Sequence, residues 1–198
     1  MIKYCVIVGV MKKLLEEYTD SELFQMLPKG GATAEKAFAE LYARLSPRVY
    51  AYCRRFLGER EEAKDVFQET FTKFFQSSSQ TREMTNVPAF ILRIARNLCM
   101  NRKRSSHSDL SFEEYMVVKE DHSNEQEELL GLIHKALEQL PDDYAEMFIL
   151  REYDGLSYSE IAEVTGENIG TVKIRLYRAK QKIKEILAPY LNEIEKYN

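Results

Sequence analysis

The stretch IAEVTGENIGTVKIRLYRAKQKIKEIL, residues 161–187, narrows the choice of folds for this chain more than any other segment. Two helical patterns flank a turn at Gly166. In a helix-turn-helix, the first helix needs a small residue at the crossing point, and the turn needs a residue that tolerates positive φ. Ala162 and Gly166 have this spacing, and Val172 follows where it can pack into the core. The other residues expected on the buried side are Ile161, Ile169 and Leu176.

The second of these helices carries charge of one sign. From Lys173 to Lys184 there are six Lys or Arg and no acid. The N-terminal part of such a helix enters the major groove, where Arg contacts guanine and Lys usually holds phosphates. This favours DNA binding over a merely solvated basic helix. The expected contact residues are Thr171, Lys173, Arg175 and Arg178, with Lys180, Lys182 and Lys184 assigned to phosphates or solvent.

A second basic helix is predicted from Pro88 to about Arg104. The chain has 198 residues and a formal net charge of −4, so contacts with nucleic acid must come from such local patches. Between residues 91 and 104 there is no acid. The polar candidates are Arg93, Arg96, Asn97, Arg102 and Arg104. Phe90 could stack on unpaired bases, but core packing is the favoured interpretation of its ring.

The helix before it, predicted over residues 59–76, is acidic instead. Its acids are Glu59, Glu61, Glu62, Asp65 and Glu69, with only two bases through Glu69. An acidic face beside a basic one suits a module that touches DNA on one side and a basic protein surface on the other.

Helical periodicity covers almost the whole chain and predicts an all-α fold. A new helix is expected to start after Pro47. We predict two small helical domains, over residues 11–104 and 127–198, joined by a flexible acidic linker over residues 105–126. Residues 1–10 are interpreted as an over-extension of the reading frame or a floppy tail.

Metal, cofactor and membrane sites are not indicated. Cys5, Cys53 and Cys99 lie far apart and match no zinc spacing, so we expect buried thiols in a reduced, cytoplasmic protein. The apolar segment at residues 1–10 is too short to span a membrane. The sequence therefore predicts no cofactor, no bound metal and no membrane insertion.

Three motifs resemble those of a known family. They are EEAKDVFQETFTKFF, AFILRIARNLCMNRKR and the long run from LPDDYAEMF to the basic helix. Together they resemble regions 2 and 4 of an extracytoplasmic function (ECF) sigma factor of the sigma-70 family. The resemblance covers residues 33–187 and occurs in the family's order. It implies a dissociable subunit of RNA polymerase that recognises promoters in transcription initiation.

The resemblance also implies roles for single residues. Asp65, Gln68 and Glu69 would contact the clamp helices of the largest polymerase subunit, with Phe67 and Phe71 in the core. The basic helix with Arg93, Arg96, Asn97, Arg102 and Arg104 would melt and read the −10 element, and the loop at 77–87 would capture a flipped base. The −35 element would be bound by Thr171, Lys173, Arg175, Arg178 and Lys182. The rest of the C-terminal domain would contact the polymerase flap. The linker would run toward the RNA exit channel, and an anti-sigma factor is a further partner of this class.

The sequence departs from the family pattern at four points. It has no Trp, and Phe90 stands where this class often has one. Asn101 replaces a common Asp, Ile174 a small polar residue, and Glu167 an apolar turn residue. Ile174 and Glu167 are expected to alter the −35 sequence that is read.

Two other function classes were weighed. A conventional helix-turn-helix regulator would act without polymerase, usually as a symmetric dimer on two half-sites. The basic helix and the acidic face in the N-terminal half argue against it. An enzyme is disfavoured, because the sequence has no phosphate-binding loop, catalytic triad or metal cluster.

Overall fold

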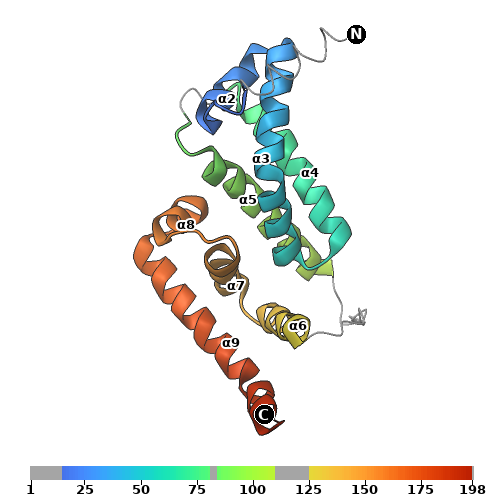
Figure 1. The fold of residues 1–198 in the computed structure, drawn as a ribbon, viewed down its shortest axis with the longest axis vertical. Helices are drawn as coiled ribbons and strands as arrows, with labels where there is room; N and C mark the ends of the chain where they lie inside the picture. The colour runs from blue at the N-terminus through green and yellow to red at the C-terminus, as the bar shows by residue number, and fades with distance from the viewer. Residues whose placement is uncertain (1–14, 81–83, 110–124, 198) are drawn as a thin grey trace. The chain divides into compact units, whose positions relative to one another are not determined.

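The computed structural model describes residues 15–80, 84–109 and 125–197, and these ranges consist of helices and their connecting turns (Figure 1). They contain no strand. The chain divides into two compact units, one ending at Asn101 and one beginning at Arg102. The predicted all-α class with two small helical domains is confirmed. The units are described separately.

The first unit is built from two short and three long helical elements. They are α2 (Asp20–Met26), the 3₁₀ turn η1 (Leu27–Lys29), α3 (Gly31–Leu57), α4 (Arg60–Ser77) and α5 (Val87–Asp109). Two of the helices begin with a side-chain cap. Thr19 and Glu22 form a capping box at α2, and Glu59 accepts hydrogen bonds from the amides of Glu61 and Glu62 at α4.

The predicted break at Pro47 is wrong, because α3 continues through this residue. Proline removes one backbone hydrogen bond and costs about 3 kcal/mol or more inside a helix. The apolar stripe nevertheless stays on one face across it, with Leu41 and Leu45 before Pro47 and Val49 and Tyr52 after it, all at most 5% exposed. Burial of several such side chains, at roughly 1.5–3 kcal/mol each, outweighs the cost.

Aromatic rings fill the centre of the first unit. The rings of Phe24 in α2 and Phe74 in α4 lie 5.1 Å apart. Phe90 in α5 joins them, at 6.0 Å from Phe24 and 6.2 Å from Phe74. The Phe90 ring thus packs on two core rings, as expected, although its side chain is half-buried. Cys53 and Cys99 are also fully buried, as predicted, while Cys5 lies outside the described residues.

The second unit contains the predicted helix-turn-helix. Its elements are α6 (Glu125–Glu138), α7 (Asp142–Phe148), the π-helical turn η2 (Ile149–Tyr153), α8 (Tyr158–Thr165) and α9 (Ile169–Tyr197). A capping box of Ser157 and Glu160 opens α8. Gly166 ends α8 in the left-handed conformation, with φ 75° and ψ 10°, as the turn requires.

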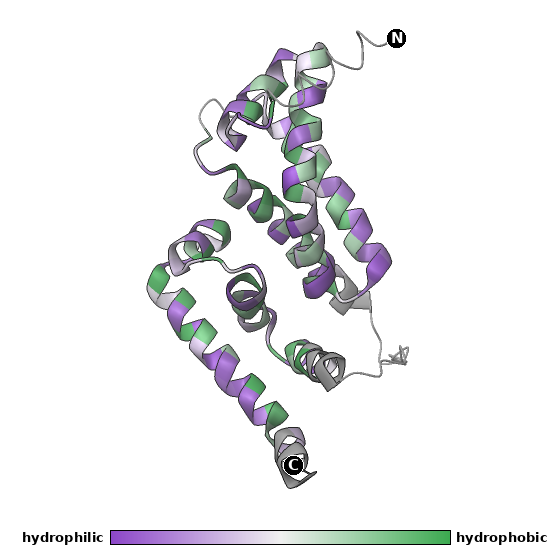
Figure 2. Cartoon of the chain, viewed as in Figure 1, coloured by the Kyte–Doolittle hydropathy of each residue, from purple (hydrophilic) through white to green (hydrophobic). Residues whose placement is uncertain are grey.

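Apolar and polar residues alternate along α9 (Figure 2). Val172 and Leu176, at 0% and 3% exposed, lie on the buried side with Ala179. The prediction that Ile169 is buried is wrong, because its side chain is 44% exposed. A helical side chain covers the turn before its own Cα, and Ile169 is the first residue of α9, so no earlier turn of that helix lies beneath it.

The predicted domain limits stay predictions. Helix α5 continues to Asp109, past the predicted limit at residue 104. Residues 1–10 and 110–124 lie outside the described residues, so the over-extension and the linker stay predictions.

Candidate nucleic-acid and protein interface

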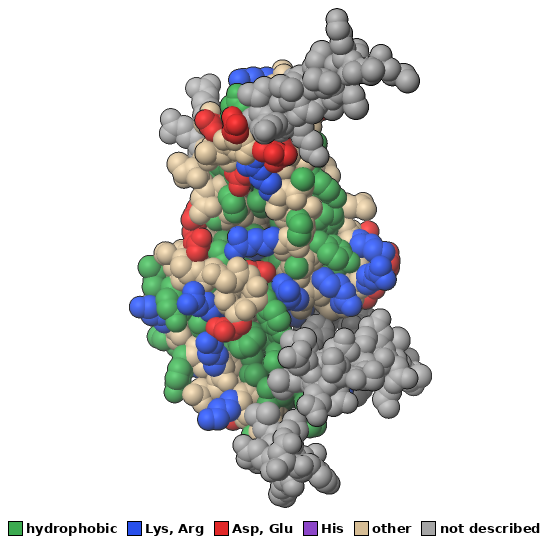
Figure 3. All heavy atoms as spheres, in the orientation of Figure 1, with side chains coloured by type: hydrophobic (Ala, Val, Ile, Leu, Met, Phe, Trp, Pro, Cys, Tyr) green, Lys and Arg blue, Asp and Glu red, His purple; other side chains and the backbone are tan. Residues whose placement is uncertain are grey.

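The start of α9 presents a mixed basic and apolar face. Lys173, Arg178 and Lys182 are exposed there, and Thr171 is half-buried. Asn168 caps the helix through its side-chain oxygen, which accepts a hydrogen bond of 2.8 Å from the Thr171 amide. Between the cations lie two exposed apolar side chains, Ile174 at 54% and Tyr177 at 65%. Basic and hydrophobic side chains share the visible face of this unit (Figure 3).

Arg175 differs from its neighbours because two carboxylates hold its guanidinium. Its Nη1 lies 2.8 Å from Glu167 in the turn, and its Nε lies 3.2 Å from Asp143 in α7. Only 26% of its side chain is exposed. Arg175 therefore ties three elements of the second unit together, and its two carboxylate partners compete with a base for its donors.

Lys173 and Arg178 make looser contacts than Arg175. The ammonium of Lys173 lies 5.7 Å from the ring centroid of Tyr158, and Arg178 donates a 3.2 Å hydrogen bond to the Tyr144 hydroxyl. Lys180 pairs with Glu152 at 2.7 Å. Cation–π contacts are weak at exposed sites, and the hydrogen bond of Arg178 is long and solvent-exposed. Lys173 and Arg178 can therefore turn toward a phosphate or a base at little cost.

The candidate residues of α5 lie partly at the surface. Arg93, Asn97 and Arg104 are exposed, whereas Arg96 and Arg102 are half-buried. The opposite side of the helix is anchored by Ile91, Ala95 and Leu98, which are at most 9% exposed. Residues 81–83 of the preceding loop lie outside the described part of the chain.

The candidate docking residues of α4 share one exposed face. Asp65, Gln68 and Glu69 are all exposed and lie at the i, i+3, i+4 spacing that places side chains side by side. Glu69 pairs with Lys73 at 3.0 Å on the surface. At the start of the helix, hydrogen bonds from the Glu62 and Glu61 amides lower the pKa of the Glu59 carboxyl below its ordinary value of 4.5.

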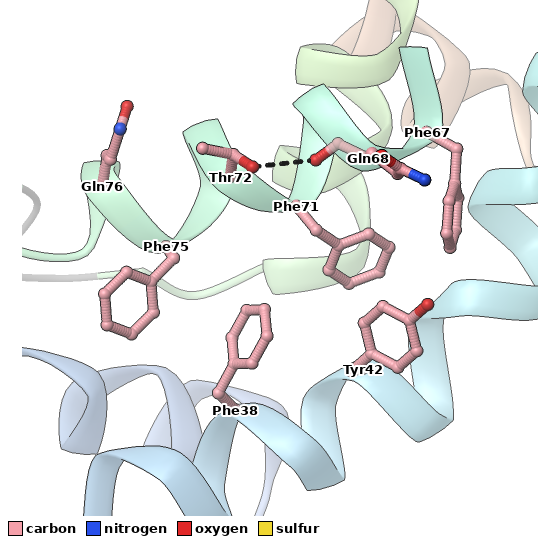
Figure 4. A pocket seen from close by; sticks show the side chains of 8 residues that line it. All are labelled: Phe38, Tyr42, Phe67, Gln68, Phe71, Thr72, Phe75 and Gln76. Atoms are coloured by element: carbon pink, nitrogen blue, oxygen red, sulfur yellow. Dashed lines mark hydrogen bonds between the residues drawn. The ribbon is translucent and has the colours of Figure 1, made fainter. Parts of the chain in front are cut away.

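An apolar groove of about 410 Å³ lies beside this acidic face. Rings from α3 and α4 point toward one another across it (Figure 4). Phe38 and Phe75 have their centroids 5.5 Å apart, and Tyr42 and Phe71 have theirs 4.6 Å apart. The aromatic groove is lined by Phe38, Tyr42, Phe67, Phe71 and Phe75, together with Gln68, Thr72 and Gln76.

One of these residues differs from the sequence-based expectation, and two others were missed. Phe71 is buried as predicted, but Phe67 is only half-buried and forms part of the groove wall. Tyr42 and Phe75, at 41% and 43% exposed, were not identified as functional from the sequence. The pair Phe74–Phe75 gave a signal, since adjacent helical residues point about 100° apart and cannot both face the core.

Comparison with known proteins decides the family. The family Sigma-70 region 2 matches residues 41–108, and Sigma-70 region 4 matches residues 130–183. The ECF RNA polymerase sigma-E factor of Salmonella typhimurium is 31% identical over 191 residues, covering 89% of this chain and 98% of the relative. The chain is an ECF sigma factor.

Other relatives agree with this assignment. The RNA polymerase sigma-H factor of Pseudomonas aeruginosa is 29% identical over 91% of this chain and 100% of its own length. Among solved structures, the sigma factor RpoE of Bartonella quintana, in complex with the anti-sigma factor NepR, has a TM-score of 0.64 and 27% identity. It covers 77% of this chain and 98% of its own. CnrH, solved with the cytosolic domain of CnrY, shares the fold with a TM-score of 0.67, 22% identity and coverage of 86% and 97%.

The family regions locate the two surfaces of this ECF sigma factor. The acidic face of α4, the aromatic groove and the basic helix α5 lie in region 2, and the helix-turn-helix lies in region 4. Within the described residues there is no group of three potential metal-binding side chains. No described helix is long and apolar enough to cross a membrane.

Proposed function

We propose that this sigma factor is a dissociable specificity subunit that binds core RNA polymerase through α4 and promoter DNA through α5 and α9. The observation that carries the proposal is the opposite charge of the exposed faces of α4 and α9. The acids of α4 complement a basic protein surface, and the cations of α9 complement the phosphates of duplex DNA.

In region 2 the acidic face and the aromatic groove would form one docking surface. Asp65, Gln68 and Glu69 supply polar contacts, and the groove takes an apolar side chain from the clamp helices of the largest polymerase subunit. Aromatic side chains at the centre of an interface usually carry much of its binding energy. The exposed rings of Tyr42 and Phe75 support this assignment.

Helix α5 would hold the −10 element. Arg93, Asn97 and Arg104 are exposed and can reach the DNA backbone or unpaired bases, with Arg96 and Arg102 beside them. Capture of unpaired bases would make binding energy available for opening the duplex. Phe90 contributes to the core contacts rather than to this surface, since it packs on Phe24 and Phe74.

Region 4 would bind the −35 element as duplex. Thr171, Lys173 and Arg178 lie at or near the start of α9, where the major groove is entered, and Lys182 follows for a phosphate. Arg175 acts here chiefly by fixing the helix, because two carboxylates hold it. The remaining surface of the domain would contact the polymerase flap.

Two further features belong to this proposal. The protein does no covalent chemistry and acts in the cytoplasm with the polymerase. The neighbouring structure of RpoE contains an anti-sigma factor, and we infer that an anti-sigma factor can likewise occupy the polymerase-binding surface of this chain.

The test is a pull-down of bacterial core RNA polymerase with the purified protein, followed by run-off transcription from genomic fragments. The expected result is a set of specific transcripts that require both the protein and the core enzyme. No polymerase binding, combined with tight binding of a palindromic duplex, would contradict the proposal and favour a conventional helix-turn-helix regulator.

A further inference from the structure

Two apolar side chains stand out on the DNA-facing part of α9. Ile174 and Tyr177 are 54% and 65% exposed and lie three residues apart, so they are neighbours on one helical face. Single exposed apolar residues are common on protein surfaces. Here the two adjoin on the helix whose other side, with Val172, Leu176 and Ala179, is at most 3% exposed.

The surroundings of the pair are basic. Lys173 precedes it and Arg178 follows it, and both are exposed. The run from Lys173 to Lys184 contains no acid. An apolar patch between cations of one sign is suited to a surface that is itself strongly negative. This charge pattern favours duplex DNA over a protein as the occupant.

Arg175 is poorly placed to read bases beside this pair. Its guanidinium is paired with Glu167 at 2.8 Å through Nη1 and with Asp143 at 3.2 Å through Nε, so these two carboxylates compete with a guanine for its donors. Ile174 and Tyr177 have no such competition. In the major groove the one apolar group on a base edge is the 5-methyl group of thymine.

We propose that Ile174 and Tyr177 are specificity-determining residues that contact thymine 5-methyl groups in the −35 element. This inference rests on the proposed function, because it needs region 4 to bind duplex DNA. The inference goes beyond the proposed function by naming the chemical group on the base that the protein recognises. The protein would prefer A·T pairs opposite these two residues and would lose affinity when the methyl groups alone are absent.

The experiment uses the full-length protein with core RNA polymerase on a promoter found by run-off transcription. Each thymine of the −35 element is replaced by deoxyuridine, which removes only the methyl group. The expected loss in promoter affinity is about fourfold at each contacted position, the value for burying one methyl-sized group. Replacing thymine by deoxyuridine at positions that these two residues do not contact should leave promoter affinity unchanged.

The protein side is tested with Ile174→Ala and Tyr177→Ala. Each variant should bind the thymine promoter more weakly and should no longer respond to deoxyuridine at its own position. This non-additivity identifies a direct contact. Tyr190→Ala is the matched control, because Tyr190 is 47% exposed on the same helix but about 20 Å from Tyr177 along its axis.

Three outcomes would lead to different conclusions about the inference and the proposed function. If polymerase-dependent transcription occurs but deoxyuridine has no effect at any position, the inference is overturned and the proposed function stands. If Ile174→Ala or Tyr177→Ala weakens polymerase binding without changing the response to deoxyuridine, the pair contacts protein and the inference is also wrong. If no polymerase-dependent transcript is found with the wild type, the proposed function itself fails.

Discussion

The exposed faces of α4 and α9 have the same design with opposite charge. Each combines exposed large apolar side chains with charges mainly of one sign, although Lys73 pairs with Glu69 on α4, and each lies on a helix whose other side is buried. Beside the acidic residues of α4 lies the aromatic groove, whose lining includes Tyr42 from α3 and Phe75 from α4. On α9, Ile174 and Tyr177 adjoin cations. The comparison teaches that apolar exposure marks a binding surface, while the sign of the surrounding charge selects the class of partner.

The largest effect is expected from reversing the charge of the α4 face. Asp65→Lys with Glu69→Lys should weaken core polymerase binding by several kcal/mol, because like charges then oppose each other in the interface. Both residues are exposed, and the Glu69–Lys73 pair is a surface pair that contributes little to folding. Affinity is measured by titrating labelled protein with core enzyme.

The matched control for this variant is Glu16→Lys with Glu17→Lys. These two acids are also exposed in the first unit and change the net charge equally. Polymerase affinity should stay near that of the wild type. If both double variants bind equally well, the docking assignment of α4 is wrong.

On α9 the corresponding test removes one exposed cation. Arg178→Ala should cost about 1–3 kcal/mol in promoter affinity, as expected for an arginine that reads a guanine. The thermal stability of the second unit should change little, because Arg178 is exposed and donates a long 3.2 Å hydrogen bond to the Tyr144 hydroxyl. Promoter affinity and unfolding temperature are measured in parallel.

Arg175→Ala provides the contrast within the same helix. It should lower the unfolding temperature as well as promoter affinity, because Glu167 and Asp143 lose their shared cation. Unchanged stability together with relaxed base preference would show that Arg175 reads DNA directly.

The groove of α4 is tested with Phe75→Ala. Removal of an aromatic ring at an interface typically costs more than about 1 kcal/mol of binding free energy. Phe75 is 43% exposed, so folding should be affected less than by a core substitution. Core polymerase affinity and unfolding temperature are compared with those of Tyr18→Ala, which removes a similarly exposed ring of the first unit that does not line the groove. Equal polymerase binding by both variants would exclude the groove from the interface.

The smallest effect concerns the helix caps, which also differ in charge. Glu59 caps α4 with a carboxylate whose pKa is lowered below 4.5, whereas Asn168 caps α9 with a neutral amide. A carboxyl with a depressed pKa in the folded state stabilises the protein above its ordinary pKa, and this contribution is lost as pH falls through the folded value. Stability should therefore decline below about pH 4.5 through Glu59, but not through Asn168.

The cap prediction is checked by denaturant unfolding at several pH values. As the pH is lowered below 4.5, the free energy of unfolding should fall less for Glu59→Gln than for the wild type. Glu17→Gln removes an equally exposed acid outside any cap and is the control. An identical pH profile for wild type and Glu59→Gln would contradict the role of the charged cap.

Local features of this fold could be predicted from the sequence. The capping box of Ser157 and Glu160 and the left-handed Gly166 depend on neighbouring residues alone, and both are present in the structure. The continuity of α3 through Pro47 could not be predicted, because it depends on burial of the stripe against other helices.

Less of the candidate site could be predicted, because much of it depends on contacts between separate elements. The basic run of α9 and the acidic face of α4 are visible in the sequence. The ion pairs that hold Arg175 join residues 8 and 32 positions apart. The aromatic groove likewise joins α3 to α4. Such contacts arise only when separate elements pack together.

The most direct test of the contrast between the two faces is site-specific photocrosslinking in the complex of polymerase, protein and promoter. A photoreactive residue replaces Gln76, which lines the groove, or Gln181, which is exposed among the cations of α9. The account predicts that position 76 crosslinks to the largest polymerase subunit and position 181 to DNA at the −35 element. Crosslinking of position 76 to DNA, or of position 181 to polymerase alone, would contradict it.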